Sequence, residues 1–189
     1  LGVDTIDLMK LANTTQFVEY NPKKFAAATA RMLYPRTTAL IFASGNMVCT
    51  GAKDELRARL ASHKYVRLLR LSGFDVKFCS FKVQNLVAST EVNFLLKLDE
   101  LSNDYGACAG YEPDLFPGLI MRIPDPKVVY LFFRSGRIVI TGARSREIIE
   151  SSFKDVYTNI LLNYKDTDNT VANSAMYRHE CTHKKMRRF

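Results

Sequence analysis

The sequence predicts an α+β fold made of two tandem repeats, each an antiparallel meander of strands closed by a helix. The first observation is internal similarity: residues of one segment recur without a gap 91 positions later, from Tyr20 and Tyr111 to Ala52 and Ala143. The second is a set of β-branched, apolar runs followed by Ser-Gly turns. The third is helical periodicity after each meander. The recurring residues of the first copy are Tyr20, Pro22, Phe25, Arg31, Pro35, Leu40, Phe42, Ser44, Gly45, Val48, Thr50, Gly51 and Ala52.

The repeat decides one ambiguous segment. Residues 25–33 are rich in alanine and favour a helix by propensity. Their counterparts, residues 116–124, contain Pro117, Gly118 and Pro124, which a helix tolerates badly. Because two copies share one backbone, both segments are predicted to be strands.

The other elements follow in order. Strands are expected at 37–42, 47–50, 128–133 and 138–141, with turns at Ser44-Gly45 and Ser135-Gly136. A helix is expected over 54–71, with Asp54 as N-cap and Gly73 as its stop. A second long helix starts near Ser145, and short helices are expected at 4–12 and near 94–101. The apolar positions expected to face inward are Leu56, Leu60, Val66 and Leu69 in the first long helix and Ile148, Ile149, Phe153, Val156, Ile160 and Leu161 in the second.

The repeats are expected at 1–73 and 74–165, followed by a basic tail at 166–189 that loses periodicity and is expected to be disordered. The second repeat opens with a strand at 81–93 whose match in the first would precede Leu1. Either the parent protein continues upstream, which we favour, or that strand is lost and the sheet has a bare edge.

Composition limits the function classes. The 189 residues carry a net charge of +8, which favours a polyanionic partner but is weak support alone. No apolar run is long enough to span a bilayer, and the N-terminus does not resemble a secretory signal. The four cysteines, without a CxxC pair, are expected to be reduced and mostly buried thiols.

Catalysis and cofactors are not expected. Residues 50–53 resemble a fragment of a phosphate-binding loop but lack its upstream glycine. His179, Cys181 and His183 offer metal ligands without a nearby fourth, so no metal is expected. The chain is predicted not to be an enzyme.

Five segments together resemble successive signatures of the TATA-box-binding protein family: residues 19–28, 35–45, 47–53, 111–120 and 139–143. The similarity runs in order from about residue 4 to 165. It implies a saddle, one curved antiparallel sheet with helices on the convex face, and binding of promoter DNA through the minor groove with apolar wedges. Some DNA-repair and RNA-cleaving enzymes contain the same module, but with added catalytic domains.

The resemblance assigns the wedge role to Phe25 and Phe42 in one copy and to Phe116 and Phe133 in the other. These rings could equally be ordinary core aromatics. The Phe-Pro-Gly turn at Phe116 favours an outward side chain.

Between the wedges the resemblance implies an apolar, charge-poor groove face with Asn85 as a central hydrogen-bond donor to A·T pairs. The same residues could be ordinary strand interior. The other groove-facing positions are Leu40, Val48, Thr50, Val87, Pro117, Leu131, Val139 and Thr141.

A basic rim should contact phosphates and make affinity salt-dependent. Its implied members are Lys24, Arg31, Lys53, Arg122, Arg137 and Arg144. Asn46 stands where the family has a lysine, and Arg134 and Leu71 also depart from its pattern, which suggests a divergent member.

Partner surfaces are implied at Arg59, Lys64 and Arg67 on the first long helix, and at Glu112 and Asp114, where the family docks transcription factor IIB. Transcription factor IIA, TBP-associated factors and a weak homodimer through the concave face are further expected partners. The basic body favours a eukaryotic nuclear protein. The alternative function is a related factor that keeps the fold and partner docking with weakened or no TATA specificity.

Overall fold

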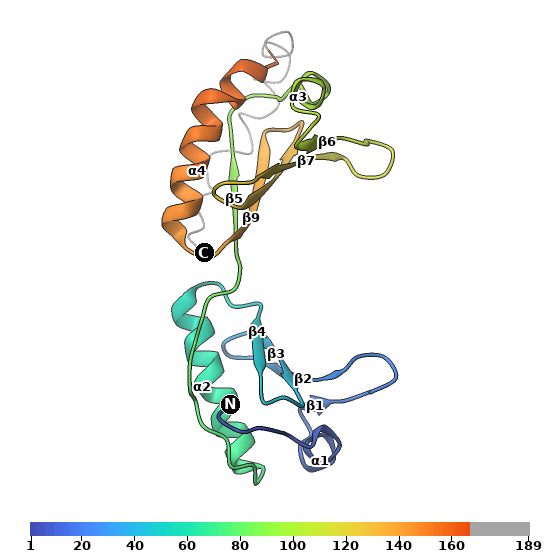
Figure 1. The fold of residues 1–189 in the computed structure, drawn as a ribbon, viewed down its shortest axis with the longest axis vertical. Helices are drawn as coiled ribbons and strands as arrows, with labels where there is room; N and C mark the ends of the chain where they lie inside the picture. Colours follow the sequence, from blue (N-terminus) through green and yellow to red (C-terminus); the bar gives the residue numbers. More distant parts are fainter. Residues whose placement is uncertain (167–189) are drawn as a thin grey trace. The chain divides into compact units, whose positions relative to one another are not determined.

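The computed structural model describes residues 1–166 and divides into two compact units. The first unit is Leu1–Lys82 and the second begins at Val83. Each unit is an antiparallel sheet with a long helix along one face (Figure 1). The predicted α+β class with two repeats is therefore confirmed.

The first unit has a four-stranded sheet in the order β1-β2-β3-β4. Its elements are α1 Leu8–Thr14, β1 Val18–Glu19, β2 Ala27–Met32, β3 Thr37–Phe42, β4 Met47–Thr50 and α2 Glu55–Leu71. Residues 25–33, for which helix and strand competed in the sequence, thus form strand β2.

The second unit has a five-stranded sheet in the order β5-β9-β8-β7-β6. Its elements are β5 Leu86–Glu91, α3 Leu98–Asp104, β6 Ala109–Gly110, β7 Gly118–Ile123, β8 Val128–Phe133, β9 Arg137–Ala143, α4 Arg146–Asn159 and the 3-10 helix Leu161–Tyr164. Strand β5 pairs with β9, whereas β4, the counterpart of β9, lies at the end of the first sheet.

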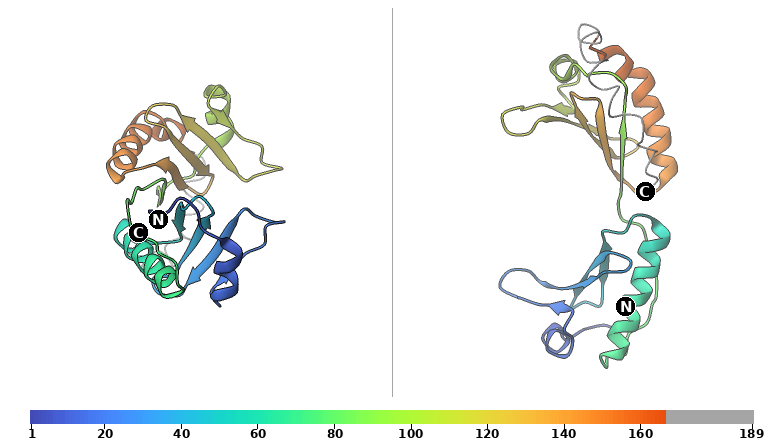
Figure 2. Two further views of the ribbon diagram at one scale, coloured as in Figure 1. Left: turned by 60° about the horizontal axis from the view of Figure 1, so that its bottom comes forward. Right: turned by 180° about the vertical axis from the view of Figure 1, so that it is seen from behind.

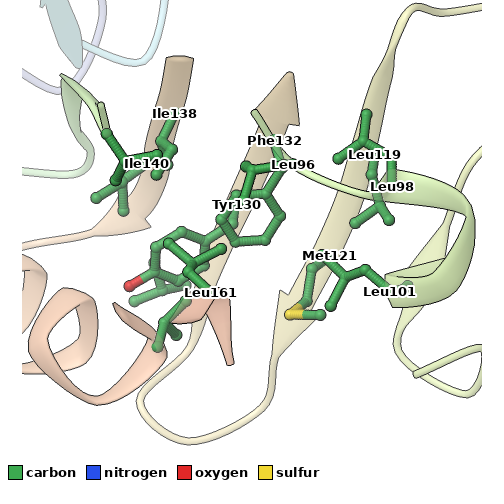
Figure 3. Close-up of a cluster of buried hydrophobic side chains, with 14 of the residues drawn as sticks. Leu96, Leu98, Leu101, Leu119, Met121, Tyr130, Phe132, Ile138, Ile140 and Leu161 are labelled. Carbon is green, nitrogen blue, oxygen red and sulfur yellow. The ribbon is translucent and has the colours of Figure 1, made fainter. Parts of the chain in front are cut away.

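The core of each unit lies between the helices and one face of the sheet (Figure 2). Strands β3 and β8 alternate strictly, with Thr37, Ala39 and Ile41 buried in one and Val128, Tyr130 and Phe132 in the other. Figure 3 shows Tyr130 and Phe132 packed with Leu96 and Leu161. Leu96 lies between β5 and α3, and Leu161 begins the 3-10 helix. The intervening residues of these strands face away from the core.

The long helices begin where predicted. The Asp54 carboxylate accepts the backbone N–H of Arg57 at 2.7 Å, and Ser145 caps α4 through the N–H of Ile148. Gly73 has φ of 85° after the end of α2. In α4, Ile149 and Val156 are buried, and Ile148 and Phe153 are partly buried against the core. Beyond its end, Ile160 is partly buried and Leu161 is buried, as predicted.

One part of the predicted stripe of α2 is wrong. Leu56 is 78% exposed and Leu60 is 47% exposed. Val66 and Leu69 are buried as predicted, but Ala61, Ser62 and Tyr65 complete the inward face. The helix is therefore turned so that a tyrosine, rather than the N-terminal leucines, packs on the sheet.

Several predicted bounds also move. The short helices begin later than expected, at Leu8 and Leu98. Asp7 caps α1 by accepting the N–H groups of Met9 and Lys10. The strand expected at 81–93 is confined to β5, and strands β1 and β6 were not predicted. The units divide after Lys82 rather than at 73/74, since Phe74, Val76 and Phe78 pack into the first core.

The remaining predictions concern thiols, metals and membranes. Cys49, Cys79 and Cys108 are free thiols, but Cys79 is exposed and the other two are half-buried, so the expectation of mostly buried thiols is wrong. Within residues 1–166, no helix could cross a membrane, and no group of side chains could hold a metal. The candidate ligands at 179–183 and the predicted tail beyond Asp166 lie outside the described residues.

Candidate nucleic-acid interface

Each sheet has an open face, opposite its helix, made of small and apolar side chains. In the first unit Leu40 pairs with Val48 and Thr38 with Thr50 across neighbouring strands. In the second, Leu131 pairs with Val139 and Val129 with Thr141. These residues are exposed or half-buried, while the alternate positions of β3 and β8 are in the core. The predicted groove-facing residues Leu40, Val48, Thr50, Val87, Leu131, Val139 and Thr141 therefore lie on open strand surface, and Pro117 is exposed beside it.

Two phenylalanine pairs lie on the open faces. The rings of Phe25 and Phe42 are 6.4 Å apart at 64°, and those of Phe116 and Phe133 are 5.9 Å apart at 65°. Both are edge-to-face pairs, an arrangement favoured by the aromatic quadrupole. Phe25 is 49% exposed and Phe116 is 36% exposed, so the alternative that all four rings are core aromatics does not hold for these two.

Matching turns place the rings in both units. The N–H of Phe25 donates to the carbonyl of Asn21, and the N–H of Phe116 donates to that of Glu112. Both turns belong to the connections that extend from the sheets beside β1 and β6 in Figure 1. The second ring of each pair ends a strand, β3 or β8, and one residue separates it from the following Ser-Gly pair.

Gly136 in the turn after Phe133 has φ of 87°, and a Cβ there would lie 2.5 Å from the carbonyl oxygen of Val92. Its counterpart Gly45 has φ of 74° and approaches the carbonyl of Val3. Only glycine combines this backbone conformation with so close an approach. The predicted turns are thus required in order to end the strands at the two phenylalanines.

Asn85 is oriented by the end of β9. The N–H of Gly142 donates to Asn85 Oδ1 at 2.8 Å, and Asn85 Nδ2 lies 3.1 Å from Thr141 Oγ1. The amide nitrogen donates one N–H to Thr141 Oγ1, and its second N–H is left for another acceptor. An exposed amide N–H₂ can donate to an acceptor at the sheet surface.

Six predicted basic residues are exposed: Lys24, Arg31, Lys53, Arg122, Arg137 and Arg144. One of them is engaged within the protein. Arg31 Nη1 donates to both carboxylate oxygens of Glu19 at 3.0 Å. At the position matching Glu19 the second repeat has Gly110, so Arg122 lacks this carboxylate and lines a cavity of about 450 Å³ with Gly106 and Gly110.

The predicted partner residues lie outside the open faces. Arg59 and Arg67 are exposed on α2, whereas Lys64 Nζ donates to the carbonyl of Tyr34 at 3.0 Å and lies over its ring. Glu112 and Asp114 are exposed in the turn before Phe116. Arg134, the residue after the second ring of this pair, lies 3.8 Å from the carboxylate of Asp166.

Sequence reasoning missed several residues of the open faces. Thr38 and Val129 alternate with the predicted Leu40 and Leu131 on the same strands, and a period of two would have found them. Thr29 and Ile120 pair with Leu40 and Leu131 from the neighbouring strands. Their place follows from the strand register, which no local pattern reveals.

Comparison with known proteins agrees with this geometry. The family model described as "Transcription factor TFIID (or TATA-binding protein, TBP)" matches residues 2–71 and 80–163. The TATA-box-binding protein of Candida albicans is 52% identical over 152 residues, 80% of this chain and 64% of that protein. TATA-box-binding protein 1 of Triticum aestivum is 49% identical over 160 residues, 85% of this chain and 68% of that protein.

The solved structure of Methanococcus jannaschii TBP is also similar. It has a TM-score of 0.74 and 37% sequence identity, and the match covers 82% of this chain and 89% of that chain. The present chain spans about two thirds or less of the length of the curated relatives, down to 55% for the Artemia franciscana protein.

Proposed function

The chain belongs to the TATA-box-binding protein family, and we propose that it is a nuclear transcription initiation factor that binds A·T-rich promoter DNA in the minor groove. The observation that carries this proposal is a phenylalanine pair in each unit, one ring exposed and the other half-buried, beside an apolar strand face. Membership of a family of DNA-binding factors also agrees with the prediction that the chain is not an enzyme.

The preference for A·T pairs follows from the chemistry of the open faces. The minor groove of A·T pairs presents acceptors only, while a G·C pair adds the guanine amino donor. Valine and leucine side chains offer no acceptor to that donor, and the Asn85 amide can donate to an A·T acceptor. A guanine at the centre of the site therefore costs binding energy.

Kinking is the proposed role of the ring pairs. Exposed, rigid rings can enter between base steps and replace part of the stacking that the kink removes. Unstacking costs a few kcal/mol per step, and the bend brings more of the DNA against the protein. The exposed rim at Lys24, Arg31, Lys53, Arg122, Arg137 and Arg144 supplies phosphate contacts.

Partner docking is proposed on surfaces that DNA leaves open. Arg59, Lys64 and Arg67 on α2 form a basic surface for transcription factor IIA or TBP-associated factors. Glu112 and Asp114 form an acidic turn for transcription factor IIB. Without DNA, the apolar open face can hold a second copy in a weak homodimer.

Duplex bending tests the wedge role. We expect Phe116→Ala with Phe133→Ala to reduce the bend of a doubly labelled TATA duplex, measured by fluorescence energy transfer. Leu33→Ala is the matched control, since Leu33 is exposed in the turn after β2 and should leave the bend unchanged. An unaltered bend in the double variant would reject the wedge role.

A gel-shift comparison separates this function from the alternative. We expect an A·T-rich duplex to bind more tightly than a G·C-rich duplex of equal length. Equal affinities would favour a related factor that keeps the fold and its partners without TATA specificity. One observation favours this alternative: Asn46 replaces a lysine of the family and removes a positive charge, and its amide donates to Ser44 Oγ at 3.2 Å.

A further inference from the structure

The residue two positions after the first ring differs between the two phenylalanine pairs. The first unit has Ala27 there and the second has Gly118. In both units this residue lies directly opposite the second ring of the pair, Ala27 across from Phe42 and Gly118 across from Phe133. A side chain at this position therefore lies between the two rings.

The space above Gly118 is filled by the rings themselves. A Cβ on Gly118 would lie 2.7 Å from Cε1 of Phe116 and 3.1 Å from Cε1 of Phe133. The backbone of Gly118 does not have a positive φ, so the backbone conformation does not demand glycine. A methyl group at position 118 is excluded only because the edge of the Phe116 ring occupies its space, and this ring can rotate away.

The first ring of each pair is less exposed, and closer to its partner ring, in the unit that has glycine at this position. Phe116, over glycine, is 36% exposed and lies 5.9 Å from its partner ring. Phe25, beside alanine, is 49% exposed and lies 6.4 Å from its partner. By register, the Ala27 methyl corresponds to the Cβ that Gly118 lacks, the position that lies against Phe116 in the other unit.

We propose that Ala27 and Gly118 are positioning residues that preset the two wedges unequally. The methyl of Ala27 keeps the Phe25 ring directed away from β2, whereas the absence of a side chain at Gly118 allows the Phe116 ring to pack against β7. Phe116 must leave Gly118 in order to enter a base step, so the second wedge reorganises on binding and the first does not. This inference rests on the proposed wedge role.

Exchanging the two residues separates the effects. Gly118→Ala should move the Phe116 ring away from the strand and expose it more. Ala27→Gly should allow the Phe25 ring to pack against the strand. Because the first unit carries a methyl beside its wedge, the methyl is compatible with insertion. We expect Gly118→Ala to tighten binding to a TATA duplex about threefold, the order expected when one ring contact need not be broken. Ala27→Gly should weaken binding by a similar factor, and the double exchange should restore it.

The ring position is measured without DNA. A single 4-fluorophenylalanine at position 116 or 25 reports its own environment by fluorine NMR in the free protein. We expect Gly118→Ala to move the position-116 resonance toward the solvent-exposed shift, and Ala27→Gly to move the position-25 resonance away from it. Unmoved resonances, or affinities that change equally in both variants, would overturn the inference.

Failure of the inference is distinct from failure of the wedge role. If Phe116→Ala with Phe133→Ala abolishes bending while Gly118→Ala moves no ring, only the positioning role is lost. If that double variant still bends DNA fully, the wedge role is wrong, and the affinity changes predicted for Gly118→Ala and Ala27→Gly are no longer expected. A raised ring without tighter binding would also count against the proposed reorganisation.

Discussion

At the residue scale, each core contains one buried tyrosine between helix and sheet, but the helix carries it in the first unit and the sheet carries it in the second. The first unit has Ala39 on β3 and Tyr65 on α2, and both are buried. At the matching positions, 91 residues later, the second unit has Tyr130 on β8 and Val156 on α4. A large residue in one layer faces a small one in the other, which conserves the packed volume.

The Tyr65 hydroxyl is an anchor for the sheet. It lies 2.9 Å from the carbonyl oxygen of Thr37 and 3.2 Å from Thr37 Oγ1. Tyr65→Phe removes these bonds and leaves a buried carbonyl short of a donor, so the unfolding free energy should fall by about 1–2 kcal/mol. Urea denaturation measures the change. Tyr34→Phe, at an exposed tyrosine, should have no effect, and an equally stable Tyr65→Phe variant would contradict the anchor role.

The same tyrosines predict a loss of stability in alkali. Burial raises the pKa of Tyr65 and of Tyr130 above the ordinary value of 10. The unfolded chain therefore loses these protons at lower pH than the folded protein does. Stability that is fully present below pH 10 should decrease as pH rises above it. Urea midpoints between pH 9 and 11 test this, and Tyr65→Phe with Tyr130→Phe should flatten the decrease relative to the parent protein.

At the element scale, the orientation of α2 is the main difference from the sequence-based expectation. The sheet side of the helix is Ala61, Ser62, Tyr65, Val66 and Leu69. Ser62 Oγ donates to the carbonyl of Ala58, which satisfies the polar group within the helix. The N-terminal leucines therefore lie outside the core, on a helix that is otherwise basic.

This orientation predicts unequal costs along one helix. Leu56→Gln and Leu60→Gln should change the unfolding free energy by no more than about 0.5 kcal/mol, as is usual for exposed positions. Leu69→Ala should cost about 2–5 kcal/mol, because Leu69 is fully buried. Thermal or urea unfolding of the three variants compares them directly. A large loss from Leu56→Gln would mean that the helix packs through its N-terminal leucines.

At the scale of the whole molecule, charge should dominate DNA affinity. The net charge is +8, and six exposed basic residues form the proposed rim. If all six contact phosphate, the logarithm of the binding constant should fall with the logarithm of salt concentration with a slope of about −5. Fluorescence anisotropy of a labelled duplex between 50 and 300 mM salt, a range chosen around physiological ionic strength, measures the slope.

The two matching arginines should contribute differently to that slope. Arg122→Ala should reduce its magnitude by about 1. Arg31→Ala should reduce it less, because Glu19 already pairs with Arg31. Glu19→Gln should raise the affinity by releasing Arg31. Equal effects of the two arginine variants would show that the Arg31–Glu19 pair does not persist in the complex.

Much of the fold was predictable because the repeat compares two sequences within one chain. Pro117 and Gly118 ruled out a helix in the second copy, and this also identified the alanine-rich strand β2 in the first. Asp54 and Ser145 were predictable caps because capping is local. The ring residues, the groove-facing strand positions and the basic rim came from family motifs, and the structure places them on exposed or half-buried surface.

Local sequence patterns were thus sufficient for the repeated strands, the caps, the turns and the family. Contacts between layers were not predictable in this way. The face of α2 that meets the sheet, the packing of Phe74 and Phe78 into the first core, and the reclined ring over Gly118 each depend on residues far apart in the chain. Shape and volume in a close-packed interior decide such contacts, and a periodic pattern carries no information about either.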